Sequence, residues 1–175
     1  MKTVRLIANF LYYLTKFLSI LFLIVAVYAA VVVILWINSK GSWLPIHVSD
    51  GVFTIYYPFT KTPFLLGDYT SSYLITSLLT VALYGVFMWL LSGVFNAFRQ
   101  ERIFTKRGVM QLSRFYITNL TIPVLCLLLL AVFGKEVSDV IVVSFLHIMI
   151  GVFAFFMAAI FKQGLVLQEE QDLTL

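Results

Sequence analysis

Charged residues are scarce in this chain. Only 11% of its 175 residues are Asp, Glu, Lys or Arg, whereas 62% are hydrophobic. In a water-soluble domain about a quarter of the residues are charged, so this chain lacks the polar surface that a soluble fold needs. The same shortage excludes a nucleic-acid-binding module, which would present a basic face on a soluble domain. The composition therefore predicts a membrane protein.

Cysteine and catalytic motifs are equally scarce. Cys126 is the single cysteine, so no disulfide can form within the chain. The sequence contains no His-Glu-x-x-His motif, no glycine-rich phosphate loop and no candidate Ser, His and Asp triad. Cys126 and His147 are expected at similar depths on neighbouring helices, but two ligands without a carboxylate fall short of a metal site. We expect neither an enzyme nor a bound metal or cofactor.

Long uncharged runs are abundant. Four runs of about 20 residues or more are long enough to cross about 30 Å of hydrocarbon as α-helices. With their flanks, they predict helices over about residues 8–38, 70–98, 106–133 and 139–168. Because the later links are short, we expect an all-α membrane protein in which one transmembrane domain, residues 1–175, forms an antiparallel four-helix bundle.

The link between the first two helices, residues 40–69, is the longest. Apolar runs flank Asp50 and Gly51, a combination that predicts a small β-hairpin. We expect Pro58 and Pro63 to end the pairing, because proline cannot donate to a strand ladder. The hairpin is expected to pack on the helix ends or to lie at the bilayer surface. The aromatic residues that would place it at the surface are Trp43, Phe53 and Tyr57.

Basic residues are unevenly distributed between the two ends of the predicted helices. Nine of the twelve fall at one end, and the other three are Lys40, Lys61 and Lys135. Because basic residues mark the cytoplasmic side of a membrane, both termini are predicted to be cytoplasmic and residues 40–69 extracytoplasmic. The inner surface would then consist of a basic loop over residues 99–107 and an acidic tail over residues 162–175.

The two inner segments supply the candidate binding residues. Their opposite charges predict contact between the basic loop and the acidic tail, and Thr105 is the expected N-cap of the third helix. The candidate partner-binding residues on this inner face are Arg99, Arg102, Lys106, Arg107, Glu169, Glu170 and Asp172.

Polar residues inside the predicted spans form a second group of candidates. They are Asn119 and Thr121 on the third helix and His147 on the fourth. Pro123 is expected to loosen the third helix, because proline removes a backbone donor. Neutral polar side chains at this depth more often form hydrogen bonds between helices than hold a substrate. An ion or substrate site at these residues is the alternative.

Two segments resemble a known family. They are the ending Ile160-Phe161-Lys162-Gln163-Gly164 with Leu167 to Leu175, and the mid-chain Phe95, Phe98-Arg99, Ile103-Phe104-Thr105, Leu112 and Arg114. Both are similar to segments of small bacterial membrane proteins grouped as domain of unknown function 2975. The layout of helices and loops is similar over nearly the whole chain, although Gly108 stands where a polar residue is expected. The resemblance implies a multi-pass protein of the bacterial cytoplasmic membrane without an established activity.

Members of that family are often encoded beside a small helix-turn-helix regulator. The resemblance therefore implies that such a regulator, or another membrane subunit, is a partner besides the lipid bilayer. The predicted function is that of a regulatory interaction protein that binds a cytoplasmic partner and no nucleic acid directly. A small-molecule or ion transporter or channel subunit, with its site on the third helix, is the alternative function. Homo-oligomerisation is left open.

Overall fold

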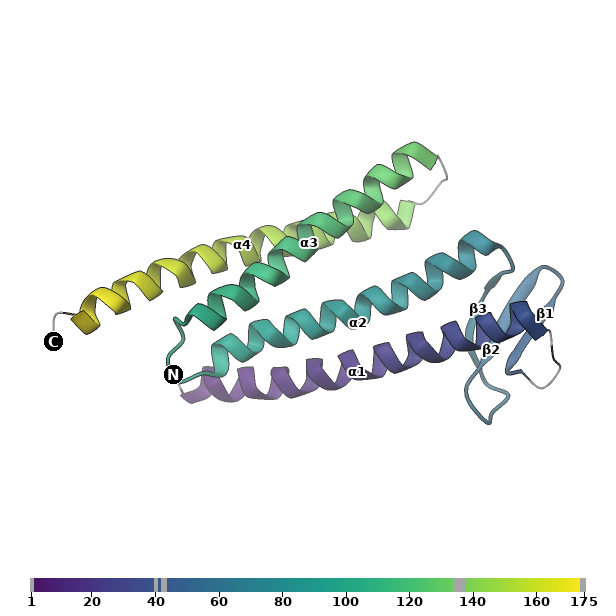
Figure 1. Cartoon of the computed structure of the whole chain (residues 1–175), viewed down its shortest axis with the longest axis horizontal. Helices are drawn as coiled ribbons and strands as arrows, with labels where there is room; N and C mark the ends of the chain where they lie inside the picture. Colours follow the sequence, from purple (N-terminus) through teal and green to yellow (C-terminus); the bar gives the residue numbers. More distant parts are fainter. Residues whose placement is uncertain (1, 40, 42–43, 134–137, 174–175) are drawn as a thin grey trace. The chain divides into compact units, whose positions relative to one another are not determined.

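A computed structural model describes residues 2–39, 41, 44–133 and 138–173 (Figure 1). Its elements are α1 (Lys2–Ser39), β1 (Ile46–Ser49), β2 (Val52–Tyr56), β3 (Pro63–Asp68), α2 (Ser71–Arg99), α3 (Lys106–Phe133) and α4 (Ser138–Leu173). In this described part of the chain, four helices are long and apolar enough to cross a membrane, as the sequence predicts. Trp43, Lys40 and Lys135 lie outside the described residues.

Two helices are longer than the sequence indicates. α1 begins at Lys2 rather than near residue 8, and α4 continues to Leu173 rather than ending near residue 168. Neither extension contains proline, and residues 165–171 are rich in Leu, Gln and Glu, which favour helix. Much of the acidic segment predicted as a tail is therefore the end of a rigid helix.

The described chain divides into two compact units. One unit comprises Phe17–Met88, and the other comprises Met1–Lys16 together with Trp89–Leu175. Each unit has its own buried apolar cluster.

The unit Phe17–Met88 contains a three-stranded antiparallel sheet in the order β1-β2-β3, together with parts of α1 and α2. Asp50 and Gly51 form the β1–β2 turn with φ values of 52° and 76°, so the predicted hairpin is present. The expectation that Pro63 ends the pairing is wrong, because Pro63 begins β3 and pairs with Tyr56. Since β3 is an edge strand and Pro63 is its first residue, the missing backbone N–H costs no ladder bond there.

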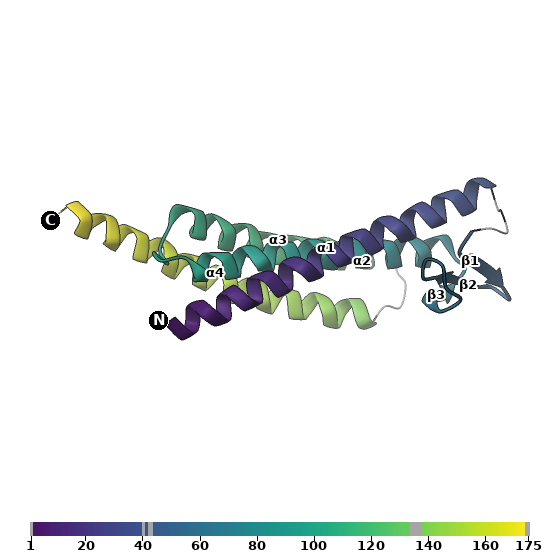
Figure 2. The ribbon, with the colours of Figure 1, turned by 90° about the horizontal axis from the view of Figure 1, so that it is seen from below.

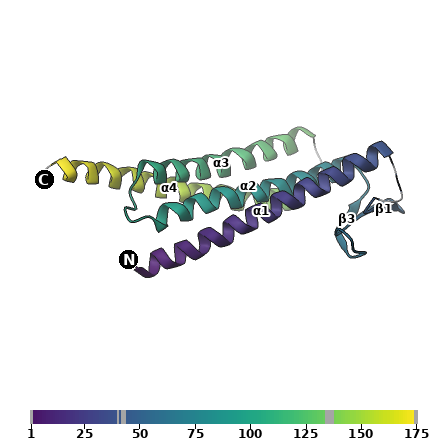
Figure 3. The same cartoon turned by 60° about the horizontal axis from the view of Figure 1, so that its bottom comes forward.

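The sheet packs on the helices through one face of β2. Phe53 and Ile55 are fully buried, and they share an apolar cluster with Val32 of α1 and Leu74 of α2. Because Phe53 is buried here, the prediction that it lies at the bilayer surface is wrong, whereas the predicted packing on the helix ends is found. Figure 3 shows the strands beside the end of α1 that lies away from the N-terminus.

In the second unit, α3 and α4 lie side by side in every view (Figure 2). Tyr116 of α3 and Phe155 of α4 meet edge to face with ring centroids 5.5 Å apart. Gly151 allows the backbones to approach, because a Cβ at this position would stand 2.8 Å from the side chain of Leu120 and 3.3 Å from the backbone of Asn119. Small residues at such contacts are the usual means by which membrane helices pack.

Candidate functional site

The connector between α2 and α3 ends in a capped helix start. The Thr105 carbonyl accepts the Val109 N–H at 3.0 Å, and Thr105 Oγ1 accepts the Gly108 N–H at 3.0 Å. Thr105 is therefore the N-cap that the sequence predicts. Gly108 is buried, and a Cβ there would lie 3.4 Å from Cβ of Ala97 and 3.2 Å from Thr105 Oγ1. The absence of a side chain at Gly108 thus allows the first turn of α3 to lie against the end of α2.

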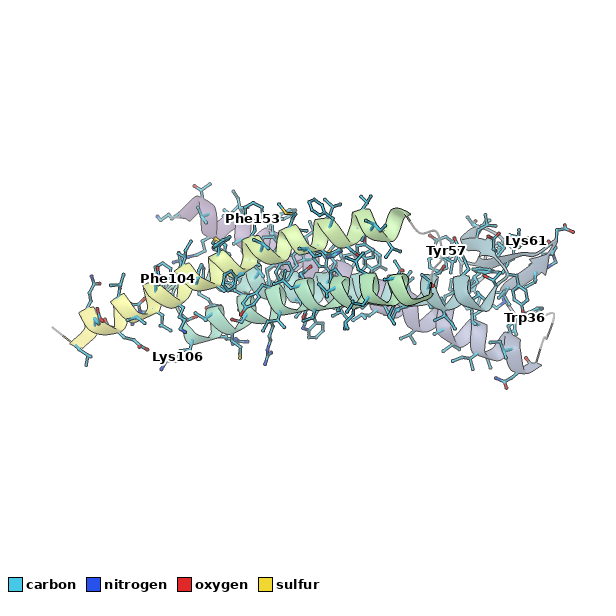
Figure 4. The ribbon with its side chains drawn as sticks, turned by 90° about the horizontal axis from the view of Figure 1, so that it is seen from above. Trp36, Tyr57, Lys61, Phe104, Lys106 and Phe153 are labelled. Atoms are coloured by element: carbon cyan, nitrogen blue, oxygen red, sulfur yellow. The ribbon has the colours of Figure 1, made fainter. Side chains whose placement is uncertain are left out.

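An aromatic cluster fixes the connector to α4. Phe161 of α4 is 2% exposed, and its ring meets Phe98 at 5.1 Å and Phe104 at 5.4 Å, both edge to face. Gly164, about one turn further along α4, accommodates Phe104, because a Cβ at Gly164 would lie 2.6 Å from that ring. Figure 4 shows Phe104 against α4, whereas Lys106 reaches outward from the start of α3. The end of α4 is therefore packed on the connector through apolar contacts.

Two ion pairs join the connector to the end of α4. Arg102 Nη1 lies 3.3 Å from Asp172 Oδ2, and Lys106 Nζ lies 3.5 Å from Glu169 Oε1. Glu169 and Asp172 are three residues apart and so share one face of α4. All four side chains are more than half exposed, so each pair contributes only about 0–1 kcal/mol to stability. The contact predicted between the acidic and basic segments is therefore formed, and the aromatic cluster supplies more of its stability.

Arg99 has a different environment from the other candidate basic residues. Its guanidinium lies 3.9 Å from the ring centroid of Tyr12, and its Nε donates to Asn96 Oδ1 at 2.8 Å. A weaker bond of 3.4 Å joins Arg99 Nη1 to Asn9 Oδ1 on α1. Stacking on an aromatic face satisfies a guanidinium as it leaves water. Arg99 is thus bound to α1 and does not join the acidic end of α4.

Other contacts at this end of the molecule were not expected from the sequence. Lys16 Nζ lies 3.3 Å from the ring centroid of Trp89, and Arg5 Nη1 lies 3.5 Å from Glu101 Oε1. The only signal for them was the grouping of basic and aromatic residues near the start of α1. We call a set of nine charged residues at the start of α1, in the connector and near the end of α4 the polar cap. Its members are Arg5, Arg99, Glu101, Arg102, Lys106, Arg107, Glu169, Glu170 and Asp172.

Two charged residues of the polar cap have no ion-pair partner among the described residues. They are Arg107 and Glu170, and both are exposed. The structure therefore brings Arg102, Lys106, Glu169 and Asp172 together, while it leaves Arg107 and Glu170 facing outward from the same region.

The polar residues within the spans separate into two groups. Asn119 is 3% exposed and its Oδ1 lies 2.8 Å from Nδ1 of His147 on α4. Asn119 Nδ2 donates to the Phe115 carbonyl at 2.9 Å, so Oδ1 is the atom that faces His147, and it accepts from the tautomer of His147 that carries its proton on Nδ1. Thr121 is exposed and donates to the Ile117 carbonyl of its own helix at 2.8 Å. The predicted trio is therefore an interhelical pair and one separate residue.

The half-buried Cys126 completes the set of chemically distinctive side chains in the spans. In the described part of the chain, no three His, Cys, Asp or Glu side chains are grouped as a metal site requires. The Asn119–His147 pair and the polar cap are the two groups of sequence-predicted residues that the structure brings together.

Comparison with known families relates most of these features to one group of proteins. A family described as Protein of unknown function (DUF2975) matches residues 54–175, well over half of the chain. The chain belongs to this family. The DUF2975 match begins within β2 and includes β3, α2, α3 and α4, and with them the connector and the acidic end of α4. No curated protein and no solved structure matches the chain.

Proposed function

We propose that this DUF2975 protein is a multi-pass membrane protein that binds a cytoplasmic protein at its polar cap and catalyses no reaction. A small helix-turn-helix regulator is the proposed partner, and another membrane subunit is the second candidate. The observation that carries the proposal is the rigid projection of the end of α4, residues 162–173, which we call the α4 arm.

The α4 arm is longer than a membrane span requires. α4 has 36 residues and so extends about 54 Å, against about 30 Å of hydrocarbon. If Phe161 lies near the membrane boundary, the arm reaches about 18 Å beyond it. One side of the arm is fixed by Gly164, Glu169 and Asp172. A span alone needs no such projection.

The other side of the arm is open and partly apolar. Val166 is 47% exposed and Leu167 is 61% exposed, and with Lys162 and Gln163 they line a shallow hollow. Exposed apolar side chains on a helix outside the bilayer favour docking against an apolar partner surface. The unpaired Arg107 and Glu170 would add polar contacts at the rim, where charge sets specificity more than affinity.

The proposed orientation places the polar cap in the cytoplasm of a bacterium. Arg5–Glu101 and Arg102–Asp172 contacts draw the start of α1, the connector and the α4 arm to one end of their unit. The count of nine basic residues against three predicts that this end is cytoplasmic. The grouping of the three segments at one end supports a cytoplasmic location for both termini. The alternative function, transport, draws on the Asn119–His147 pair alone, because Thr121 is bonded within its own helix.

Copurification from the native membrane tests the proposal. The variant R107Q/E170Q removes two charges of the polar cap that have no ion-pair partner among the described residues, and it leaves both ion pairs to the arm intact, so a bound protein should be recovered in lower yield. The matched control is the lipid-facing variant Phe153→Leu, on the same helix, which should retain the partner. A reporter fused after Leu175 must show the same membrane orientation in all variants. Equal recovery of every protein from the wild type and from R107Q/E170Q would count against the polar cap as the binding surface.

A further inference from the structure

The turn between β2 and β3, residues 57–62, presents an aromatic ring to the surroundings. Phe59 is 106% exposed and has a φ of 61°, in the left-handed region. Four hydrogen bonds close the turn: Tyr57 N–H to the Thr62 carbonyl, Thr60 N–H and Thr60 Oγ1 to the Tyr57 carbonyl, and Thr62 N–H to Thr60 Oγ1. The conformation of the turn is thus fixed by its own threonines, with Phe59 outside the network.

A phenylalanine is an unfavourable choice for this position in water. The left-handed region suits Gly, Asn and Asp, and a bulky residue there is unusual. Full exposure also forfeits the gain from burying an aromatic ring. Both costs fall on the same side chain, which indicates that Phe59 has an apolar environment outside the protein.

The position of the sheet along α1 identifies that environment. Tyr28 Oη donates to the Tyr56 carbonyl at 2.8 Å, so the end of β2 lies at the level of Tyr28. An open sheet cannot enter hydrocarbon, because its edge strands would leave backbone groups unsatisfied. The hydrocarbon core around α1 therefore cannot extend past about Tyr28 toward the C-terminal end of the helix.

The start of α2 indicates the depth of the sheet. The apolar stretch of α2 that could cross a membrane begins at Tyr73, and Leu74 lies in the same buried cluster as Phe53 and Ile55 of β2. Because the sheet packs where that stretch begins, it lies at the end of the span and close to the bilayer surface.

We infer that the β2–β3 turn anchors the sheet in the interfacial layer of the bilayer, with Phe59 and the neighbouring Tyr57 among the lipid headgroups. Tyr57 is 47% exposed and is supported from behind by Phe64, with ring centroids 5.1 Å apart. Lys61, four residues after Tyr57 in the same turn, is exposed and so can reach water. Aromatic rings concentrate in this layer of membranes. The inference is independent of any partner at the polar cap.

A polarity-sensitive fluorophore tests the anchor in the full-length protein. Cys126→Ser with Phe59→Cys gives one labelling site in the turn, and Cys126→Ser with Asp50→Cys gives a matched site at the opposite end of β2, which is likewise exposed with positive φ. The labelled proteins are placed in vesicles of phosphatidylcholine and phosphatidylglycerol in equal parts, with nitroxide lipids as quenchers. We expect a blue shift at position 59, with severalfold stronger quenching by headgroup-proximal nitroxides than at position 50.

A second labelling site keeps Phe59 in place. In Cys126→Ser with Lys61→Cys, we expect shallow quenching between the values at positions 59 and 50, and adding Phe59→Ser should lower it. Weak quenching at 59, equal to that at 50, would overturn the inference. A blue shift at 59 without quenching by any lipid would also overturn it, because another protein copy would then cover the ring. Quenching at 61 that is unchanged by Phe59→Ser would show that the ring is no anchor.

Discussion

Asn119 on α3 and His147 on α4 are joined by a hydrogen bond of 2.8 Å between Oδ1 and Nδ1. The bond satisfies two polar side chains between neighbouring helices, and it lies close to Gly151, where the two backbones approach. Pro123 adds to the polarity of this region, because it cannot donate to the carbonyl of Asn119 four residues before it. The pair is accounted for by association of α3 with α4.

Replacing Asn119 by leucine should destabilise the protein by about 1 kcal/mol, because His147 loses its acceptor between the helices. Reversible unfolding in mixed micelles of dodecyl maltoside and sodium dodecyl sulfate measures the loss. Thr121→Val is the matched control and should be nearly neutral, since Thr121 is exposed and bonded within its own helix. A double-mutant cycle of Asn119→Leu with His147→Leu should give a coupling of about 0.6 kcal/mol, the average for polar pairs in membranes. If Thr121→Val costs as much as Asn119→Leu, the pair has no special role.

Replacing Gly151 by alanine and replacing Gly93 by alanine should change the stability of the protein in opposite directions. Each lies inside a helix, where alanine is favoured over glycine by about 1 kcal/mol. A Cβ at Gly93 would make ordinary contact at 3.6 Å with Gln111, so Gly93→Ala should be neutral or stabilising. At Gly151 the Cβ would overlap Leu120, so Gly151→Ala should destabilise by about 1–3 kcal/mol. The same unfolding assay decides the matter, and stabilisation by Gly151→Ala would show that α3 and α4 are less closely packed than described.

The N-cap of α3 can be tested separately. Thr105→Ala removes the acceptor for the Gly108 N–H and should cost about 1 kcal/mol. Thr105→Ser retains the hydroxyl and should recover most of that loss. An equal loss from both substitutions would indicate that the methyl group of Thr105, rather than its hydroxyl, supplies the stability.

The docking of the α4 arm predicts a specific cross-link. In a Cys126→Ser background, Arg102→Cys with Asp172→Cys should react rapidly with a short bifunctional maleimide, because the native side chains meet at 3.3 Å. Arg99→Cys with Asp172→Cys is the control and should react more slowly, since Arg99 is turned toward Tyr12. The yields are read as mobility shifts on denaturing gels after reaction in membranes. Equal yields from both pairs would contradict a docked arm.

Much of the fold could be predicted because its signals are local. Uncharged runs that are long enough, as helices, to cross a bilayer locate the helices. Asp50 and Gly51 mark the hairpin turn, because both residue types tolerate positive φ. β3 was not predicted because proline usually ends a strand, and the edge position that permits Pro63 depends on the sheet order. Helix ends were also uncertain, because charged and apolar segments alike continue α1 and α4.

The candidate sites were less predictable, because pairing depends on how the helices pack. Opposite charge suggested contact between the connector and the acidic segment, but it could not show that Arg102 and Lys106 pair while Arg99 turns to α1. From the sequence alone, Asn119, Thr121 and His147 are equally good candidates for a polar site within the spans. Which side of α3 packs against α4 decides the difference: Asn119 bonds to His147 across the two helices, whereas Thr121 bonds within its own helix. The strained φ of Phe59 has no local signal at all.

Photo-crosslinking from the α4 arm in living cells is the most direct test of the proposed partner binding. A benzophenone side chain at Leu167 lies on the open side of the arm, and one at Phe153, which is 68% exposed on the same helix, reports the lipid-facing surface (Figure 4). Binding of a cytoplasmic protein predicts a discrete adduct of higher mass from position 167 and none from position 153. No adduct from position 167, or the same adducts from both positions, would contradict the account.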